Sequence, residues 1–294
     1  LRAQGDITLG NVAAANVSVD SDGGSVVNAT GSATNVTATT LRLQAQGSIG
    51  TGARALSTSV GTLTALAATG SVYLTEANGV TVGDVAVTVR EFNADATSTN
   101  VVDAAQSDLT TGANGNVVLV ATLGDITLNE GTATGAGQAV SASGSGSVRI
   151  EAVAGSLTAG TAADVRSGTG DITLRAGQNL ALGANVDVAT AGSGTVSLNA
   201  VAGTLTMTGT GNVTATGSSA RLRAQGGITL GNVTATSVSI VSDAGSLVNA
   251  ANSTTNVTAT NLRLQAQGGM GVNTRHLSTS VDTLTALAAT GSVY

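Results

Sequence analysis

Few side chains in this sequence belong to the types that carry out acid, base or nucleophilic chemistry. His276 is the only histidine, and cysteine is absent. A Ser-His-Asp or Cys-His arrangement needs a histidine held beside its nucleophile. Residues 222–294 duplicate residues 1–73, and the first copy has Ala55 where the second has His276. We therefore expect His276 to be a surface residue, and we exclude nucleophilic catalysis of these two kinds.

Carboxylates are the remaining route to catalysis, because β-helical polysaccharide-cleaving enzymes use paired acids. Asp6, Asp125 and Asp171 occupy the same slot of a recurring G-D-I-T-L segment, at the start of an expected strand. An acid at that place can cap a turn, and Gly227 replaces Asp6 in the second copy. Sugar-cleaving sites also use aromatic platforms, whereas only Tyr73, Phe92 and Tyr294 are aromatic here. We therefore expect that the protein is not an enzyme.

One segment has a weak similarity to a calcium-binding turn. It is DSDGG, from Asp20 to Gly24, whose carboxylates could supply oxygen ligands. The second copy reads VSDAG and lacks one of the two acids. We expect a capped turn, with no metal site and no cofactor.

Arginines recur in a fixed position of the pattern. Arg42, Arg149, Arg221 and Arg263 each stand just before the second aliphatic residue of a strand-like segment. We expect all four to face outward in a column on one sheet. Such a column could bind an acidic glycan, or it could keep the sheet soluble while its stems cover apolar surface; the second interpretation is favoured.

Net charge and hydropathy exclude two further classes of partner. The formal net charge is −6 and lysine is absent, whereas nucleic acids and anionic membranes are bound by clustered cations. No apolar run approaches the roughly 18 residues of a membrane span. We expect neither nucleic-acid binding nor a membrane span.

The elements that must position these residues are repetitive. Residues 1–73 recur at an offset of 221, and 54 of the 73 positions are identical. Within this unit, short segments with two alternating aliphatic residues begin near Ala15, Thr39, Gly61, Val85, Gly115, Gly146, Gly170, Gly194, Ser218, Thr236, Thr260 and Asp282. Nine steps separate Ala15 from its counterpart Thr236. The pattern predicts one nine-rung repeat unit over 1–221, and the first third of the next unit over 222–294, in a single continuous solenoid.

Each rung is expected to contain three short strands. Residues Thr236–Thr260, for example, contain TSVSIV, GSLVNA and NVTAT, with Gly, Asn, Asp or Ser at the joints. So few residues per strand leave no room for helical crossovers, so we predict an all-β, single-stranded, three-sheet parallel β-solenoid (β-helix). About 12 rungs of 18–31 residues give a rod of about 58 Å. Asn93–Asp108 and Asn129–Gly146 are expected to be long loops, either decorative or binding.

Several segments carry a family resemblance. GDITL, LRAQGDITLGNV, GSVRIEAVAGSLTAG and GDITLRAGQNLALG resemble the haemagglutinin repeats of filamentous-haemagglutinin-type adhesins, the large exoproteins of bacterial two-partner secretion. The resemblance covers essentially the whole chain as a degenerate pattern. It implies a right-handed β-helix, an extracellular or cell-surface location on a Gram-negative bacterium, and a shaft role in adhesion or biofilm. This sequence lacks the family's secretion domain and an RGD motif, so the resemblance implies neither a secretion route nor a receptor.

Our leading hypothesis is a structural shaft segment of a giant secreted or cell-surface adhesin or extracellular fibre. The expected partners are other copies of the repeat, stacked end to end within one chain or as a head-to-tail polymer. One alternative is a glycan-binding solenoid module that uses the arginines or the long loops. The other alternative is a polysaccharide-active β-helix enzyme.

Overall fold

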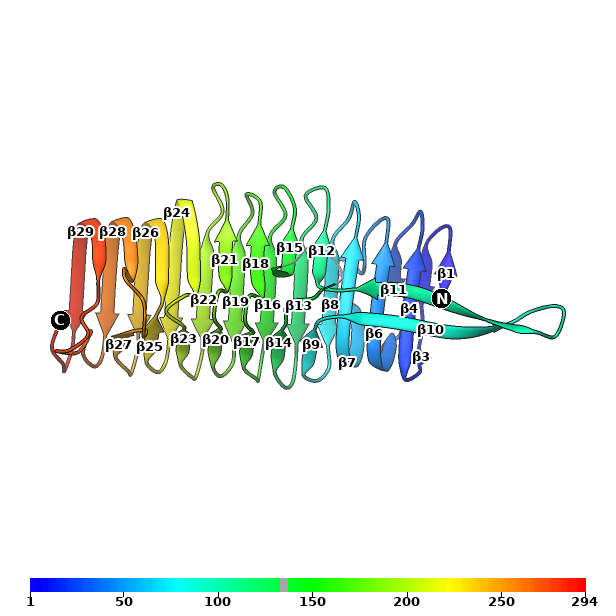
Figure 1. Ribbon diagram of the computed structural model, residues 1–294, viewed down its shortest axis with the longest axis horizontal. Helices are drawn as coiled ribbons and strands as arrows, with labels where there is room; N and C mark the ends of the chain where they lie inside the picture. The colour runs from blue at the N-terminus through cyan, green and yellow to red at the C-terminus, as the bar shows by residue number, and fades with distance from the viewer. Residues whose placement is uncertain (133–136) are drawn as a thin grey trace.

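The computed structural model describes residues 1–132 and 137–294, and these form an all-β parallel solenoid (Figure 1). The chain coils so that each strand pairs in parallel with the strand one turn before it and the strand one turn after it. The alternation of aliphatic and polar residues accounts for this arrangement, because it turns one face of every strand toward a shared interior. The predicted three-sheet β-solenoid is confirmed.

Strands fall on three faces of the coil, which we call the first, second and third sheets. The first sheet contains β1 (Arg2–Ala3), β4 (Asn16–Ser21), the second halves of β6 (Val36–Ala45) and β7 (Leu56–Ala67), β12 (Leu109–Thr111), β15 (Gln138–Ala142), β18 (Asp164–Ser167), β21 (Asp187–Thr190), and the first halves of β24 (Asn212–Ala224), β26 (Asn232–Ser242), β28 (Val257–Ala266) and β29 (Thr279–Ala288).

The second sheet contains β2 (Ile7–Leu9), β5 (Val26–Asn28), β8 (Val72–Glu76), β13 (Val117–Ala121), β16 (Val148–Ala152), β19 (Ile172–Ala176), β22 (Val196–Ala200), and the second halves of β24, β26, β28 and β29. The third sheet contains β3 (Val12–Ala13), the first halves of β6 and β7, β9 (Val80–Val82), β14 (Ile126–Leu128), β17 (Leu157–Ala159), β20 (Leu180–Leu182), β23 (Leu205–Met207), β25 (Ile228–Leu230) and β27 (Leu247–Asn249).

Inward side chains stack in columns along the axis. One column of the second sheet runs through every turn in the described residues: Ile7, Val26, Ile49, Val72, Val117, Val148, Ile172, Val196, Ala220, Val238, Leu262 and Leu284. These twelve aligned positions agree with the predicted number of rungs. All are aliphatic, and the ten from Val26 to Leu262 belong to a single buried core, whereas Ile7 is partly buried and Leu284 of the last turn is exposed. Burial of such surface stabilises the coil by about 25 cal/mol per Å².

One segment leaves the coil. β10 (Val85–Phe92) and β11 (Ser98–Gln106) pair antiparallel as a long hairpin, which lies across the outside of the first turns and extends past β1 (Figure 1). The prediction that Val85 begins a rung strand was therefore wrong, and so was the prediction of a loop over Asn93–Asp108. Val85 and Val87 are buried, but against the outer surface of the coil. Aliphatic and polar residues alternate in the same way in a strand buried inside the coil and in a strand packed against its outer surface.

The hairpin changes the number of turns in a repeat unit. From Leu43 the first sheet steps through Ala65, Leu109, Val140, Val165, Val188, Val213 and Val233 to Val257, which is eight turns. The counterpart of Leu43 is Leu264, which lies on the second sheet of that last turn. The predicted nine-rung unit is corrected to eight turns plus one sheet, because the Val85 segment adds no turn.

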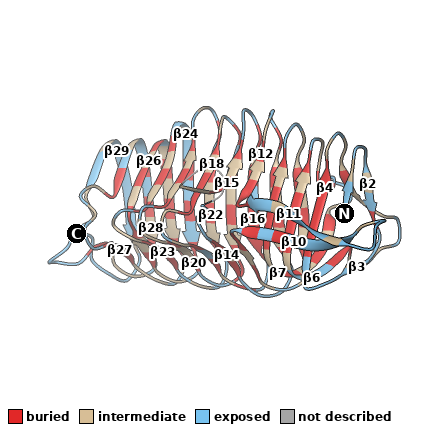
Figure 2. Ribbon diagram, turned by 45° about the vertical axis from the view of Figure 1, so that its right-hand side comes forward, coloured by how far each residue is buried: buried red, intermediate tan, exposed pale blue. Residues whose placement is uncertain are grey.

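The second segment that was expected to be a long loop contains a strand. β15 lies within Asn129–Gly146, while residues 133–136 of that segment are outside the described residues. β29 ends the coil and is largely exposed on its outer side (Figure 2). An exposed end turn offers unpaired backbone groups to a further strand.

Candidate functional site

Three of the four candidate arginines lie in one column. Arg149 of β16, Arg221 of β24 and Arg263 of β28 share one register on the second sheet. Arg42 of β6 lies on the first sheet, so the predicted column of four is wrong for this residue. The reason is the advance of one sheet per unit, which puts Arg42 and its counterpart Arg263 on different faces.

These arginines differ in what they contact. Arg149 forms an ion pair with Glu151, which also pairs with Arg175 of the next turn. The Arg42 side chain is only 8% exposed, and its Nε donates a hydrogen bond to the carbonyl oxygen of Ala104 at 3.2 Å. Arg221 makes no hydrogen bond or ion pair with any described residue. Among the described residues, Arg221 and Arg263 of this column therefore have no ion pair, although Arg263 hydrogen-bonds to Ser239 and Gln265.

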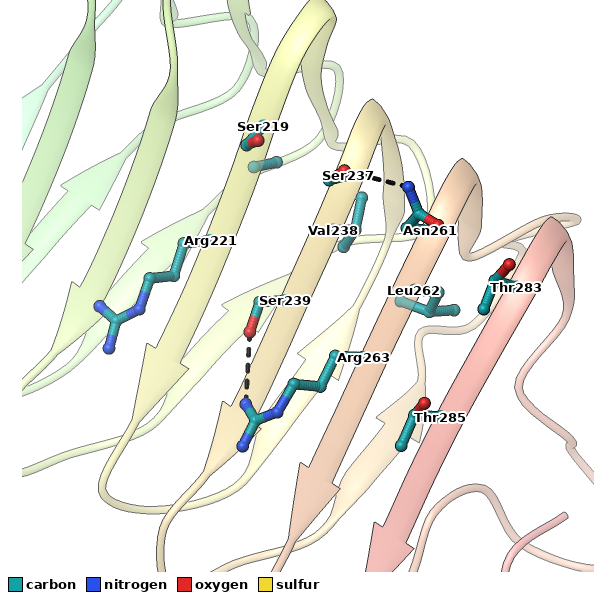
Figure 3. Close-up of a pocket in the computed structure, with 11 residues that line it drawn as sticks. Ser219, Arg221, Ser237, Val238, Ser239, Asn261, Leu262, Arg263, Thr283 and Thr285 are labelled. Carbon is teal, nitrogen blue, oxygen red and sulfur yellow. Dashed lines mark hydrogen bonds between the residues drawn. The ribbon is translucent and has the colours of Figure 1, made fainter.

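Arg221 and Arg263 border a shallow groove of about 460 Å³ on the second sheet (Figure 3). We call this the open groove. Its lining comes from four successive strands: Ser219, Ala220 and Arg221 of β24, Ser237, Val238 and Ser239 of β26, Asn261, Leu262 and Arg263 of β28, and Thr283 and Thr285 of β29. Ser239 accepts a hydrogen bond from Arg263 at 3.4 Å. The groove is thus apolar at its base and cationic along one side.

The corresponding surface of the first copy is covered. It lies on β4, β6 and β7, and the β10–β11 hairpin packs over it. Gln106 of the hairpin donates from Nε2 to the carbonyl oxygen of Leu43 at 2.9 Å and to Thr64 Oγ1 at 3.1 Å. Thr64 is fully buried, whereas its counterpart Thr285 is exposed. Two nearly identical surfaces therefore differ in whether a hairpin covers them.

Acids in the G-D-I-T-L slot cap turns, as predicted. Oδ1 of Asp6, Asp125 and Asp171 each accepts a backbone N–H bond from the next turn, from Ser25, Ser156 and Thr195 respectively, at 2.7 Å in all three cases. Each carboxylate is committed to holding adjacent rungs together. We assign these three residues a structural role.

The DSDGG turn is occupied by contacts within the protein. Asp22 accepts hydrogen bonds from Arg2 and Gln4. Asp20 lies under the hairpin. Its Oδ1 has no hydrogen-bond partner, and its Oδ2 lies 3.9 Å from Nη1 of Arg42. Burial raises the pKa of Asp20, and the positive charge of Arg42 opposes this rise. Within the described part of the chain, no three His, Cys, Asp or Glu side chains are grouped to hold a metal ion.

Among the described residues, four buried acids were not singled out from the sequence: Glu76, Asp108, Glu151 and Asp164. Glu76 is fully buried and accepts bonds from Thr58 Oγ1 at 2.6 Å and from the Val60 N–H at 3.1 Å. Burial raises its pKa above the usual range. Asp108, at the base of the hairpin, has a pKa raised to about 6, chiefly by burial. Nothing in the segments around these acids distinguishes them from surface acids, so only the fold reveals them.

His276 is exposed in the final turns. Its Nε2 lies 3.1 Å from the carbonyl oxygen of Asn273, and its ring stacks on Tyr294 with centroids 6.1 Å apart. None of the acids discussed above contacts it. The structure thus places His276 at the surface, as predicted.

Comparison with protein-family models, curated proteins and solved structures found no match for this chain. Among the described residues, no helix is long and apolar enough to cross a membrane.

Proposed function

We propose that the protein is a shaft segment of a long secreted or cell-surface fibre, in the manner of filamentous-haemagglutinin-type adhesins, with a structural role and no catalytic one. The observation that carries this proposal is the unbroken column from Ile7 to Leu284, in which every turn pairs with the next. Adding units to such a coil lengthens it without any new kind of contact.

The placement of the polar residues supports the same function. The conspicuous carboxylates, Asp6, Asp125 and Asp171, hold successive turns together. Duplication of the first 73 residues preserves the inward aliphatic positions but exchanges Asp6 for Gly227 and Ala55 for His276. What recurs is the scaffold, as a shaft requires. Chains of increasing unit number should form rods of increasing length, which electron microscopy can measure; compact particles would oppose the proposal.

A second candidate function is glycan binding, which the unpaired Arg221 and the open groove favour. An acidic glycan would need several cations, and only Arg221 and Arg263 border the groove. We expect a sulfated-glycan array probed with the 294-residue chain to give no saturable signal at physiological salt. The matched reagent is the Arg221→Ala, Arg263→Ala double variant. A saturable signal that the double variant loses would support glycan binding over the shaft alone.

A further inference from the structure

The open groove and the surface beneath the hairpin are two copies of one surface. At an offset of 221, Ser239 corresponds to Ser18, Leu262 to Leu41, Arg263 to Arg42 and Thr285 to Thr64. In the first copy Ser18, Arg42 and Thr64 are all buried. In the second copy Arg263 and Thr285 are exposed and Ser239 is half-buried. The second copy therefore carries the same surface without its cover.

The groups that hold the hairpin are retained in the second copy. The first copy holds it through Arg42, which donates to Ala104 O, through the carbonyl oxygen of Leu43, and through Thr64 Oγ1, which donates to Asp108 O at 2.9 Å. Arg263, Leu264 and Thr285 supply the same donor groups and backbone carbonyl in the open groove. A hairpin of the same sequence would find every one of these partners there.

The hairpin is also longer than the surface it covers in this chain. Val85, Val87, Val89 and Val101 lie on its inward face, as the strand pairing shows. Val85 and Val87 are 2% exposed, but Val89 is 51% and Val101 is 40% exposed. The tip of the hairpin passes beyond β1 (Figure 1), and these two valines stay partly exposed although they lie on the inward face. A hairpin with an apolar pair left half-exposed on its inward face could cover more turns than it covers here.

The second sheet has a surface that the tip of a second hairpin could cover. Past β24, the second sheet continues in register over β22, β19 and β16, whose outward residues include Arg175 and Arg149. With Arg221 and Arg223 of β24, this strip carries four arginines against two acids, Glu151 and Asp243, so it is cationic. The hairpin carries three acids, Glu91, Asp95 and Asp103, and one base, Arg90. The two surfaces are complementary in charge.

One exchange between the copies improves this fit. In the first copy Asp103 interacts electrostatically with both Arg2 and Asp20. The second copy keeps the arginine as Arg223 and replaces Asp20 by Val241. An acid in the place of Asp103 would meet Arg223 without a counterpart of Asp20 beside it, while Arg223 keeps its ion pair with Asp243, as Arg2 does with Asp22.

We propose that the open groove binds a second hairpin of the β10–β11 type, contributed by the repeat unit that would follow Tyr294 as Leu74–Gln106 follows Tyr73. Each hairpin then lies across its own unit and the unit before it and holds the two together. We call a hairpin in this position a strap. The inference rests on the proposed function in one respect, because it requires units joined in a row. Since the groove lies one sheet round from the first hairpin, successive straps occupy successive faces of the rod.

Cysteine labelling tests this proposal, because the native chain has no cysteine. Ser18→Cys and Ser239→Cys are each made in the 294-residue chain, and Ser239→Cys also in a longer chain in which the Leu74–Arg221 sequence follows Tyr294. In the 294-residue chain, Ser239→Cys should react with a maleimide at least about tenfold faster than Ser18→Cys, because only the latter is covered. In the longer chain, the Ser239→Cys rate should fall to that of Ser18→Cys.

Two controls distinguish coverage of Ser239 by the appended hairpin from coverage by the added turns of the coil. β26 lies two turns inside the end of the coil, so stacked turns alone leave Ser239 uncovered. Replacing the appended hairpin by a short Gly-Ser turn should therefore restore fast labelling. Thr206→Cys, exposed on the third sheet, should react equally in both chains.

Three outcomes would overturn the proposal, and they are distinguishable. If the longer chain forms a longer rod by electron microscopy but Ser239→Cys still reacts fast, the strap is wrong and the shaft stands. If the rod does not lengthen, the shaft fails and the strap fails with it. If heparin protects Ser239→Cys in the longer chain while the appended hairpin does not, the groove is a glycan site.

Discussion

At the scale of single residues, Asp108 is a buried acid with a strongly raised pKa. It lies buried where the hairpin rejoins the coil, with Oδ1 unpartnered and Oδ2 accepting a bond from Ser107 at 2.8 Å. Burial raises its pKa from 3.8 to about 6, and the charges of Asp84 and Glu130 add to the rise. The folded state therefore binds the Asp108 proton more tightly than the unfolded state does.

This pKa predicts a pH dependence of stability. Because the folded pKa is the higher one, the free energy of unfolding falls as pH rises from about 4 to about 6 and is level above that. Asp108→Asn should remove this fall, making the variant more stable at pH 7.5 by on the order of 1 kcal/mol after allowance for solvent screening. Urea unfolding between pH 4 and pH 8 measures it. Asp282→Asn, exposed in the last turn, is the control, and pH curves of Asp108→Asn and wild type that run parallel would contradict the assignment.

Sequence reasoning at this scale succeeded where a residue acts through its local segment. The turn-capping role of Asp6, Asp125 and Asp171 followed from their slot at the start of a strand, and the internal copy identified His276 as a surface residue. Sequence reasoning did not identify Asp108 and Glu76 as buried, because their burial depends on distant parts of the chain. The burial of Arg42 was missed for the same reason, since β11 is the element that covers it.

At the scale of elements, a ladder of glycines forms one corner of the coil. Gly70, Gly115, Gly146, Gly170 and Gly194 follow one another along the axis, and a Cβ on each of the last four would meet the carbonyl oxygen of the glycine one turn before at 1.9–2.2 Å. Thr111, Ser167 and Thr190 donate hydroxyl bonds to carbonyl oxygens of the same ladder. The first and second sheets meet at this corner with their backbones in close contact.

Gly146→Ala should therefore destabilise the coil. The added methyl would lie 2.0 Å from the Gly115 carbonyl oxygen, so adjacent turns must separate, at a cost of about 1–3 kcal/mol. Gly10→Ala is the matched control, because a Cβ there meets nothing within 4 Å. Urea unfolding followed by circular dichroism compares the two variants. Equal stabilities would show that the corner is not closely packed.

The sequence predicted most of the elements but misassigned three strands: β10 as a rung strand, and β11 and β15 as parts of loops. Period-two alternation and turn residues at the joints were sufficient for three strands per turn. The β10 strand has the same alternation, yet its valines pack on the outside of the coil. Only the pairing partner distinguishes a rung strand from a strap, and antiparallel pairing with β11 leaves no mark on the sequence of β10 alone.

At the scale of the whole molecule, the repeat unit is a screw operation. A unit of 221 residues advances the chain by eight turns and one sheet, so equivalent surfaces wind round a three-sided rod and return to the same face after three units. A shaft with straps on every face would resist bending in all directions. This arrangement follows from the strand register, and the sequence spacing concealed it because the hairpin segment has nearly the length of one turn.

The length of the rod as a function of unit number tests the central claim most directly. Chains of one, two and three 221-residue units, each followed by residues 222–294, are imaged by negative-stain electron microscopy. With eight and one-third turns per unit and a spacing of about 4.8 Å between strands, each added unit should lengthen an unbranched rod of constant width by about 40 Å. Particles that grow in width, or compact particles whose longest dimension does not rise in step with unit number, would contradict the account.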